Sequence, residues 1–379
     1  MSATAARSDG VTATRCDART VNVIEPTLED VSGHSLNVVR SLSTAGQGLR
    51  FRLWIGRDAK LSVLRGIADE LRPYFRRRLR KLQAYLLYRR LLRTGEPIVV
   101  TTAGTLDLYA LDWGATGVIP PATVFLYFHQ VRRLTDKKRE RFRRLAKKQP
   151  NLVLMGTTPA ITEIFRDCGF PHATTLSLPP GLVNDTFPEE PLPFQRLLYA
   201  GAARTDKGFG AIVDLVSHLA ATDSTIPITV QTSGDHYGRY DAQVRAHLDR
   251  LRTISYAPLT TLPDPLDLGQ YAALFPGSIS LQPYQRAEYA TKMSAITLDS
   301  LTAGCPVVTV AGTSMAETVE HFGAGAIVAE PTPEALGQAC AEVIAEYPRY
   351  RDNARRAGAQ IRRENSWGPL IDALRRERP

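Results

Sequence analysis

Residues 278–317 read SISLQPYQRAEYATKMSAITLDSLTAGCPVVTVAGTSMAE, and this stretch decides the fold class. It predicts a buried strand (278–281), a polar loop, a helix (294–304) and a second strand (306–310). The helix ends at a glycine, and a proline opens the following strand. Strand, helix and strand in this order are typical of a parallel α/β sheet.

The loops that follow these two strands are rich in polar side chains. In an open α/β sheet such loops lie at the carboxyl edge, where ligands bind. Hydroxyls, a cation and helix N-termini together suit a phosphorylated, polyhydroxylated ligand. The candidate ligand-binding residues are Tyr284, Glu288, Lys292, Ser294, Thr313 and Glu317.

Two motifs resemble the donor-binding half of GT-B glycosyltransferases, especially the family-four-like bacterial enzymes. One is Asp299 followed, after four residues, by Gly-x-Pro-Val-Val. The other is LLYAGAARTDKGF (197–209), a strand running into a Gly-rich loop with Arg204 and Lys207. The resemblance implies that Gly201, Arg204 and Lys207 hold a nucleotide diphosphate and that Asp299 binds the nucleotide ribose.

The chain departs from the family pattern at two positions. Ala202 stands where the family has an arginine directly after the glycine, so Arg204 would have to reach the phosphate instead. Thr291 stands where the family has its first acidic residue, which touches the donor sugar. Glu288 lies near enough to substitute for it, whereas Lys292 and Ser294 could bind phosphate at the helix N-terminus.

The same alternation of strands and helices occurs on both sides of a proline-dense stretch at 179–193. We therefore expect two doubly wound Rossmann-like α/β domains facing across a cleft, the arrangement that the GT-B resemblance implies. The expected parts are a disordered tail (1–18), an N-terminal acceptor-side domain (19–185), a linker (186–194), a C-terminal nucleotide-sugar-binding domain (195–362) and a helix that crosses back to the first domain (363–379).

Charge is distributed unevenly along the 379 residues, whose net charge is +9. Segment 72–93 interleaves arginines with leucines and tyrosines at helical spacing, which predicts a basic amphipathic helix. Contact with an anionic membrane, a plain surface helix and nucleic-acid binding are all open for it, and we favour the membrane. Segment 132–148 is poorer in apolar residues and is typical of a solvated face.

The bulk composition is that of a globular protein, with 44% hydrophobic residues. No run approaches the roughly 20 apolar residues that span a bilayer. The four cysteines have no metal-like spacing, so we expect reduced thiols in a cytoplasmic protein. A peripheral location at the inner membrane face is open for it.

Polar residues also follow the predicted strands of the first half. Gly33 and His34 lie in the loop after the first strand, where they could contact the acceptor or a sugar. His129 ends the strand TVFLYFHQ and could orient the donor sugar or act as a base. Glu25 and Asp30 are the candidate bases if the reaction inverts configuration.

These observations favour a metal-independent glycosyltransferase that moves a sugar from a nucleotide-sugar to a glycan or lipid-linked acceptor in cell-surface polysaccharide or glycoconjugate synthesis. We expect no metal and no cofactor besides the nucleotide-sugar co-substrate, and no nucleic-acid partner. The alternatives are a sugar-nucleotide epimerase or phosphorylase of the same fold, or a basic binding protein without activity. Release of nucleoside diphosphate only in the presence of acceptor separates the three.

Overall fold

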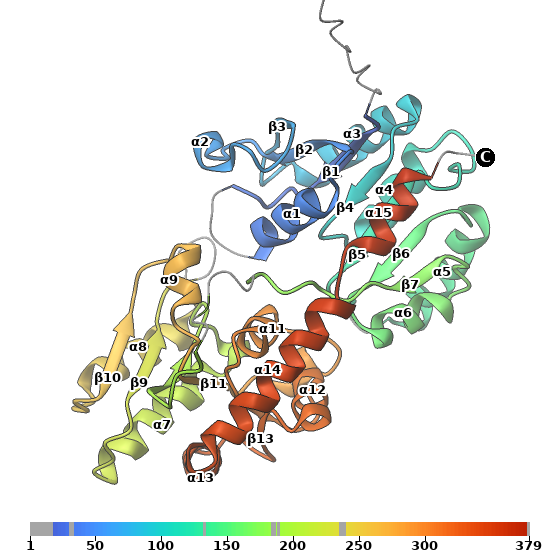
Figure 1. The fold of residues 1–379 in the computed structure, drawn as a ribbon. Coiled ribbons are helices and arrows are strands. Elements are labelled where there is room, and N and C mark those ends of the chain that lie inside the picture. Colours follow the sequence, from blue (N-terminus) through green and yellow to red (C-terminus); the bar gives the residue numbers. More distant parts are fainter. Residues whose placement is uncertain are drawn as a thin grey trace, which may run out of the picture.

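The computed structural model describes residues 18–29, 34–131, 134–182, 187, 190–234 and 240–376. In this part of the chain the strands form two parallel sheets, each at the centre of its own lobe. The upper lobe in Figure 1 holds the first sheet and the lower lobe the second. Two doubly wound α/β lobes confirm the fold class that the sequence predicts.

The N-terminal sheet has the order β3-β2-β1-β4-β5-β6-β7 in the described residues. Its strand order reverses between β1 and β4, which places the carboxyl ends of both strands beside the space between the lobes. Its strands are β1 (Thr20–Ile24), β2 (Arg50–Gly56), β3 (Glu70–Phe75), β4 (Ile98–Val100), β5 (Val124–Phe128), β6 (Val153–Gly156) and β7 (Ala173–Thr175).

The C-terminal sheet has the order β10-β9-β8-β11-β12-β13, and it reverses between β8 and β11. The central strands β9, β11 and β12 are short and buried, as expected for a sheet covered on both faces, whereas the edge strand β10 is partly exposed. The strands of this sheet are β8 (Arg196–Tyr199), β9 (Ile228–Gln231), β10 (Leu259–Leu262), β11 (Ser278–Gln282), β12 (Val307–Val310) and β13 (Gly325–Val328).

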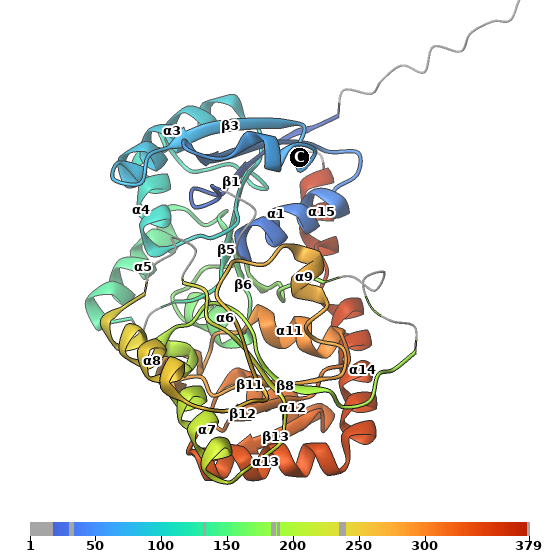
Figure 2. The same ribbon diagram turned by 90° about the vertical axis from the view of Figure 1, so that its left-hand side faces the viewer.

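Helices cover both faces of each sheet (Figures 1 and 2). In the N-terminal lobe they are α1 (His34–Ala45), α2 (Leu61–Leu64), α3 (Arg80–Thr94), α4 (Thr105–Gly114), α5 (Asp136–Lys148) and α6 (Pro159–Arg166). The C-terminal lobe adds η2 (Thr205–Lys207), α7 (Phe209–Ala221), α8 (Ala242–Thr253), α9 (Leu268–Ala272), α10 (Arg286–Tyr289), α11 (Ala295–Thr302), α12 (Ser314–Phe322), α13 (Pro333–Ala345) and α14 (Tyr347–Glu364).

The last helix, α15 (Gly368–Arg375), lies on the N-terminal lobe beside α1 in both views. The apolar side chains of Leu370, Ile371 and Leu374 are buried there, and Trp367 donates from Nε1 to the hydroxyl of Ser41 at 2.8 Å. The chain therefore passes between the lobes a second time after α14.

The two crossings between the lobes touch one another. Asn365, between α14 and α15, donates to the carbonyl of Leu178 in the first crossing at 2.9 Å. A direct bond also joins the lobes, since the Thr158 hydroxyl donates to the Thr291 carbonyl at 2.9 Å. These contacts fix how the edges of the two sheets face each other.

The prediction of one amphipathic helix over residues 72–93 is wrong for the first residues of this segment. Residues up to Phe75 belong to the edge strand β3, which pairs in parallel with β2, and α3 begins only at Arg80. Pro73 has no N–H to donate, and an edge strand tolerates it. The helix α4 (TLDLYALDWG) is an element that the sequence reading left out.

No helix in the described part of the chain is both long and apolar enough to cross a membrane. Cys168, Cys305 and Cys340 are buried free thiols, and Cys16 lies outside the described residues.

Candidate active site

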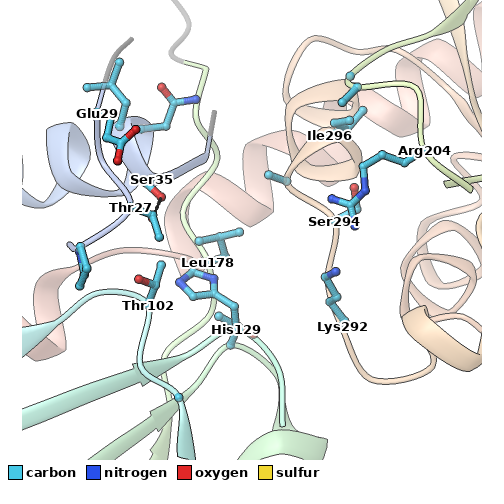
Figure 3. A pocket seen from close by; sticks show the side chains of 18 of the residues that line it. Thr27, Glu29, Ser35, Thr102, His129, Leu178, Arg204, Lys292, Ser294 and Ile296 are labelled. Carbon is cyan, nitrogen blue, oxygen red and sulfur yellow. Dashed lines mark hydrogen bonds between the residues drawn. The ribbon is translucent and has the colours of Figure 1, made fainter. Parts of the chain in front are cut away.

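A cleft of about 1960 Å³ separates the lobes and is lined by residues from both. Figure 3 shows Thr27, Thr102 and His129 of the N-terminal lobe on one side, and Arg204 and Lys292 of the C-terminal lobe on the other. The cleft meets each sheet at its carboxyl edge, the position at which open α/β sheets bind ligands.

The loop after β8 brings a lysine against a glycine backbone. Gly201 has φ +92°, and a Cβ there would lie 2.8 Å from Lys207 Nζ and 2.5 Å from Ile296 Cδ1. Gly208, with φ +69°, approaches Pro283 so closely that a Cβ would overlap its carbonyl. Both positions therefore require glycine, and together they fold the loop so that Lys207 lies over it.

Lys207 is partly buried, and this position makes it an electrostatically unusual cation. Removal from water, followed by the proximity of Arg204, lowers its pKa to about 8. The neighbouring Arg204 is held by Asp206 through two bonds, Nε to Oδ1 at 2.8 Å and Nη2 to Oδ2 at 2.6 Å. A bound anion would restore the charged form of Lys207, so this loop is a candidate phosphate site.

A third cation, Lys292, comes from the loop before α11. Its Nζ lies 4.7 Å from the centre of the Tyr289 ring, and its backbone carbonyl accepts from the Ser314 hydroxyl at 2.8 Å. Burial lowers its pKa too. Ser294 is the N-cap of α11 and lines the cleft, so the amino end of this helix faces the same space.

Asp299 is at the cleft wall, but its carboxylate already has three donors. It accepts from the backbone N–H of Gly181 at 2.8 Å and of Leu182 at 3.1 Å, and from the Tyr271 hydroxyl at 3.1 Å. Burial raises its pKa to about 6. The side chain thus ties α11 to the first crossing between the lobes, a role that its spacing in the sequence did not indicate.

His129 follows β5 and lies on the N-terminal wall of the cleft. Its Nε2 is 2.8 Å from the Thr101 carbonyl oxygen, which can only accept, so Nε2 carries the proton. Burial lowers the pKa of the ring to about 4, and the charge of Lys292 across the cleft acts in the same direction. The imidazole is therefore neutral at neutral pH, with Nδ1 as its basic nitrogen.

Glu25 is fully buried after β1 and does not line the cleft. Its oxygens accept from the hydroxyls of Thr27 at 2.5 Å, Thr101 at 2.8 Å and Thr102 at 2.8 Å. A carboxylate with these partners holds the ends of β1 and β4 together, and we leave it out of the proposed chemistry.

Several other predicted residues do not line the cleft. Tyr284 is buried in a small aromatic cluster, and Thr313 caps α12 by accepting from Ala316 N. Glu288 and Glu317 are exposed outside the cleft. Asp30 and Gly33 lie outside the described residues, and of His34 only the backbone is described, at the start of α1. Spacing alone does not show on which side of a loop a side chain emerges.

Some cleft residues were missed by the sequence reading. Gln231 ends β9, and its Oε1 accepts from Gly201 N at 2.6 Å, which helps to set the phosphate loop. Ser233 follows on the same edge and accepts from Gln231 at 3.1 Å. The sequence did carry a signal for these residues. The apolar strand ITV is followed by the polar residues QTS, and polar residues at the carboxyl end of a parallel strand are typical of a ligand-binding edge.

Solved structures resemble this fold over nearly the whole chain. A glycosyltransferase from Rickettsia africae matches with TM-score 0.68 and 10% identity, over 95% of this chain and 100% of that one. The Anabaena protein HepE, in complex with UDP and glucose, matches with TM-score 0.67 and 11% identity, over 94% and 98%. The chain has the GT-B fold.

A third GT-B structure, trehalose-6-phosphate from E. coli bound with UDP-2-fluoro glucose, has TM-score 0.65 and 14% identity, over 95% of this chain and 100% of that one. No family model and no curated protein matches the sequence. At these identities the likeness establishes the GT-B fold, and the chemistry has to be argued from the cleft.

Proposed function

We propose that this protein is a glycosyltransferase that moves a sugar from a nucleotide-sugar donor to a glycan or lipid-linked acceptor in cell-surface glycoconjugate synthesis. The observation that carries the proposal is the loop in which the partly buried Lys207 lies over Gly201 at the carboxyl edge of the second sheet. A cation beside bare backbone in such a loop suits a diphosphate.

The reaction would break the bond between the sugar and the diphosphate, and the departing oxygen would gain negative charge. Lys207 and Lys292 are placed in the C-terminal wall to stabilise that charge, with the amino end of α11 beside them. Burial disfavours the charged form of both lysines in the empty cleft, so a bound anion stabilises that form strongly. These groups would take the place of a divalent metal ion.

The donor is proposed to be a UDP-sugar, because HepE and the E. coli protein of the same fold are seen with UDP or a UDP-sugar. The sugar would extend from the diphosphate toward the N-terminal wall. His129 lies there as a neutral imidazole, which can help to position a sugar.

Contact with an anionic membrane is the second part of the proposal. The outer side of α3 exposes three leucines, Leu79, Leu82 and Leu86, among its arginines. Isolated exposed leucines are ordinary, but a stripe of them on a basic helix suits the interface of an acidic bilayer. An enzyme held there would meet lipid-linked acceptors at the inner membrane face.

The test is a release assay with a panel of nucleotide-sugars and a bacterial lipid extract. Free nucleoside diphosphate should form from one or few donors, and only when the extract is present. Release without extract, or from no donor in the panel, would argue against transfer; a change in the sugar stereochemistry of the donor without release would indicate an epimerase.

A further inference from the structure

The N-terminal wall of the cleft carries a second set of cations, separate from the donor loop. It comprises Arg40, Lys60, Arg77, Arg80 and Lys81. Within the described residues, Arg40, Lys60, Arg80 and Lys81 form no ion pair shorter than 4.0 Å. A donor diphosphate at Lys207 lies on the other lobe, so these cations have no role in the donor site as proposed.

Carboxylates do not cancel this second set. Asp107 lies among them, but it accepts from the Tyr88 hydroxyl at 2.6 Å and from Gly104 N at 2.8 Å, and burial raises its pKa. Glu29 is the other acidic side chain of this wall in the described residues. Four of these cations, Arg40, Lys60, Arg80 and Lys81, stand against these two carboxylates, and the excess of positive charge favours an anionic ligand.

The same wall has large apolar side chains that water can reach. Trp113 and Leu106 of α4 are 61% and 48% exposed, and both line the cleft together with Tyr85 of α3. Trp113 is held in place by its stacking on Tyr109, with ring centres 6.2 Å apart, and Arg141 lies 3.7 Å from the Tyr109 ring. An exposed, braced tryptophan inside a ligand cleft is an apolar contact surface.

The two helices that provide these groups lie against each other. Gly114 at the end of α4 is so close to α3 that a Cβ would lie 3.2 Å from Arg89 N. At the other end of the pair, the charge of Arg80 acts on the Asp107 carboxyl in the first turn of α4, so the start of α3 lies near Leu106. The exposed leucines Leu79, Leu82 and Leu86, at the start and on the outer side of α3, continue the apolar surface away from the cleft. Figure 2 shows α3 and α4 along one side of the N-terminal lobe.

We propose that this wall binds an amphiphile with a phosphorylated head, with the phosphate against Arg80 and Lys81 and the chain along Tyr85, Leu106 and Trp113. This inference rests on the proposed function and narrows it, because it makes the acceptor a lipid phosphate rather than a free glycan. A neutral oligosaccharide would gain nothing from the cations, and a free phosphate would gain nothing from the tryptophan.

Trp113 supplies its own reporter for a test. The chain has three tryptophans, and the other two, Trp54 and Trp367, are 8% and 3% exposed. Dodecyl phosphate below its micelle concentration should shift the tryptophan emission of the full-length protein to shorter wavelength. Inorganic phosphate has the anion without the alkyl chain, and dodecyl maltoside has the alkyl chain without the anion. Each should bind at least about tenfold more weakly than dodecyl phosphate.

Matched variants locate the site. Arg80→Gln with Lys81→Gln should weaken dodecyl phosphate binding about tenfold or more. The control, Arg89→Gln with Arg93→Gln, removes the same charge from the same helix outside the cleft and should bind as wild type does. Trp113→Phe should lose the emission change but still bind dodecyl phosphate by calorimetry, and Lys207→Ala should bind it unchanged.

Equal affinity for dodecyl maltoside, or equal losses in the two double variants, would overturn the inference. Binding that Lys207→Ala abolishes would also overturn it, because the probe would then lie in the donor site. UDP titrated into the same preparation keeps the two proposals apart. If the protein binds UDP but not dodecyl phosphate, only the proposal of a lipid phosphate acceptor is contradicted. If it binds dodecyl phosphate but not UDP, the proposed UDP-sugar donor is contradicted and the lipid site stands.

Discussion

Lys207 lies over Gly201 so closely that a single added methyl group at position 201 would lie 2.8 Å from its Nζ. The same carbon would lie 2.5 Å from Ile296 Cδ1, so the first turn of α11 also borders the space above Gly201. Lys207 is partly buried and lines the cleft, so an anion in the cleft can reach its ammonium.

Gly201→Ala should therefore weaken UDP binding at least about tenfold, because the methyl group displaces the ammonium. Gly48→Ala is the matched control: Gly48 also has positive φ, at +88°, but no atom lies within 4 Å of its added Cβ. Both variants pay a backbone cost of about 1 kcal/mol in stability, and only the first should lose UDP affinity. Calorimetry and urea unfolding measure the two effects; similar UDP affinity in both variants would contradict the loop geometry.

UDP binding should take up a proton above pH 8. Free Lys207 has its pKa lowered to about 8, and a diphosphate favours the charged form, so the pKa rises in the complex. Affinity should be steady below pH 8 and fall above it, by up to about tenfold per pH unit, until the pKa of the complex is reached. Calorimetry at pH 9 in two buffers of different ionisation enthalpy measures the uptake. Lys207→Arg stays charged and should show none; equal uptake there would assign the proton to another group.

Asp299→Asn and Asp299→Ala should differ in stability. The carboxylate accepts from Gly181 and Leu182, and an amide oxygen can replace it there, whereas alanine leaves both N–H groups without this partner. The alanine variant should lose about 1–3 kcal/mol of unfolding free energy at pH 8.

The asparagine variant should be at least as stable as wild type at that pH. Because the folded pKa of Asp299 is raised to about 6, its contribution is greatest below the unfolded value of about 4 and is lost as pH rises through 6. Urea unfolding at pH 5 and pH 8 follows both variants. Equal destabilisation by asparagine and alanine would show that the charge itself is needed, as a ribose contact or otherwise.

Local patterns were sufficient for the fold. Alternating buried strands and amphipathic helices predicted two parallel α/β lobes, and Gly201 and Lys207 come together as the GT-B motif implies. Tertiary pairing was not visible in the same patterns. Residues 72–75 were predicted as the start of a helix but belong to an edge strand, and Asp299 is spaced like a ligand residue but bonds the interlobe crossing. A carboxylate shows its partners only when distant backbone is placed around it.

The exposed leucines of α3 should carry membrane binding. Leu79→Gln, Leu82→Gln and Leu86→Gln together remove apolar area that would otherwise insert beside the arginines. Wild type should sediment with phosphatidylglycerol vesicles at low salt and be partly released at high salt, because salt screens the charges over about 8–10 Å. The triple variant should stay in solution, and Ile327→Gln, an exposed apolar residue of the other lobe, should sediment as wild type does. Equal capture of wild type and the triple variant would leave α3 an ordinary surface helix.

The account depends above all on Lys207 acting on the leaving diphosphate. The most direct measurement is acceptor-dependent release of UDP from the UDP-sugar that wild type uses, compared with that of Lys207→Ala at pH 7. We predict about a hundredfold lower turnover in the variant, because one charge contact to the leaving group is lost, with an unchanged circular-dichroism spectrum. A folded variant that releases UDP at the wild-type rate would contradict the proposed donor site.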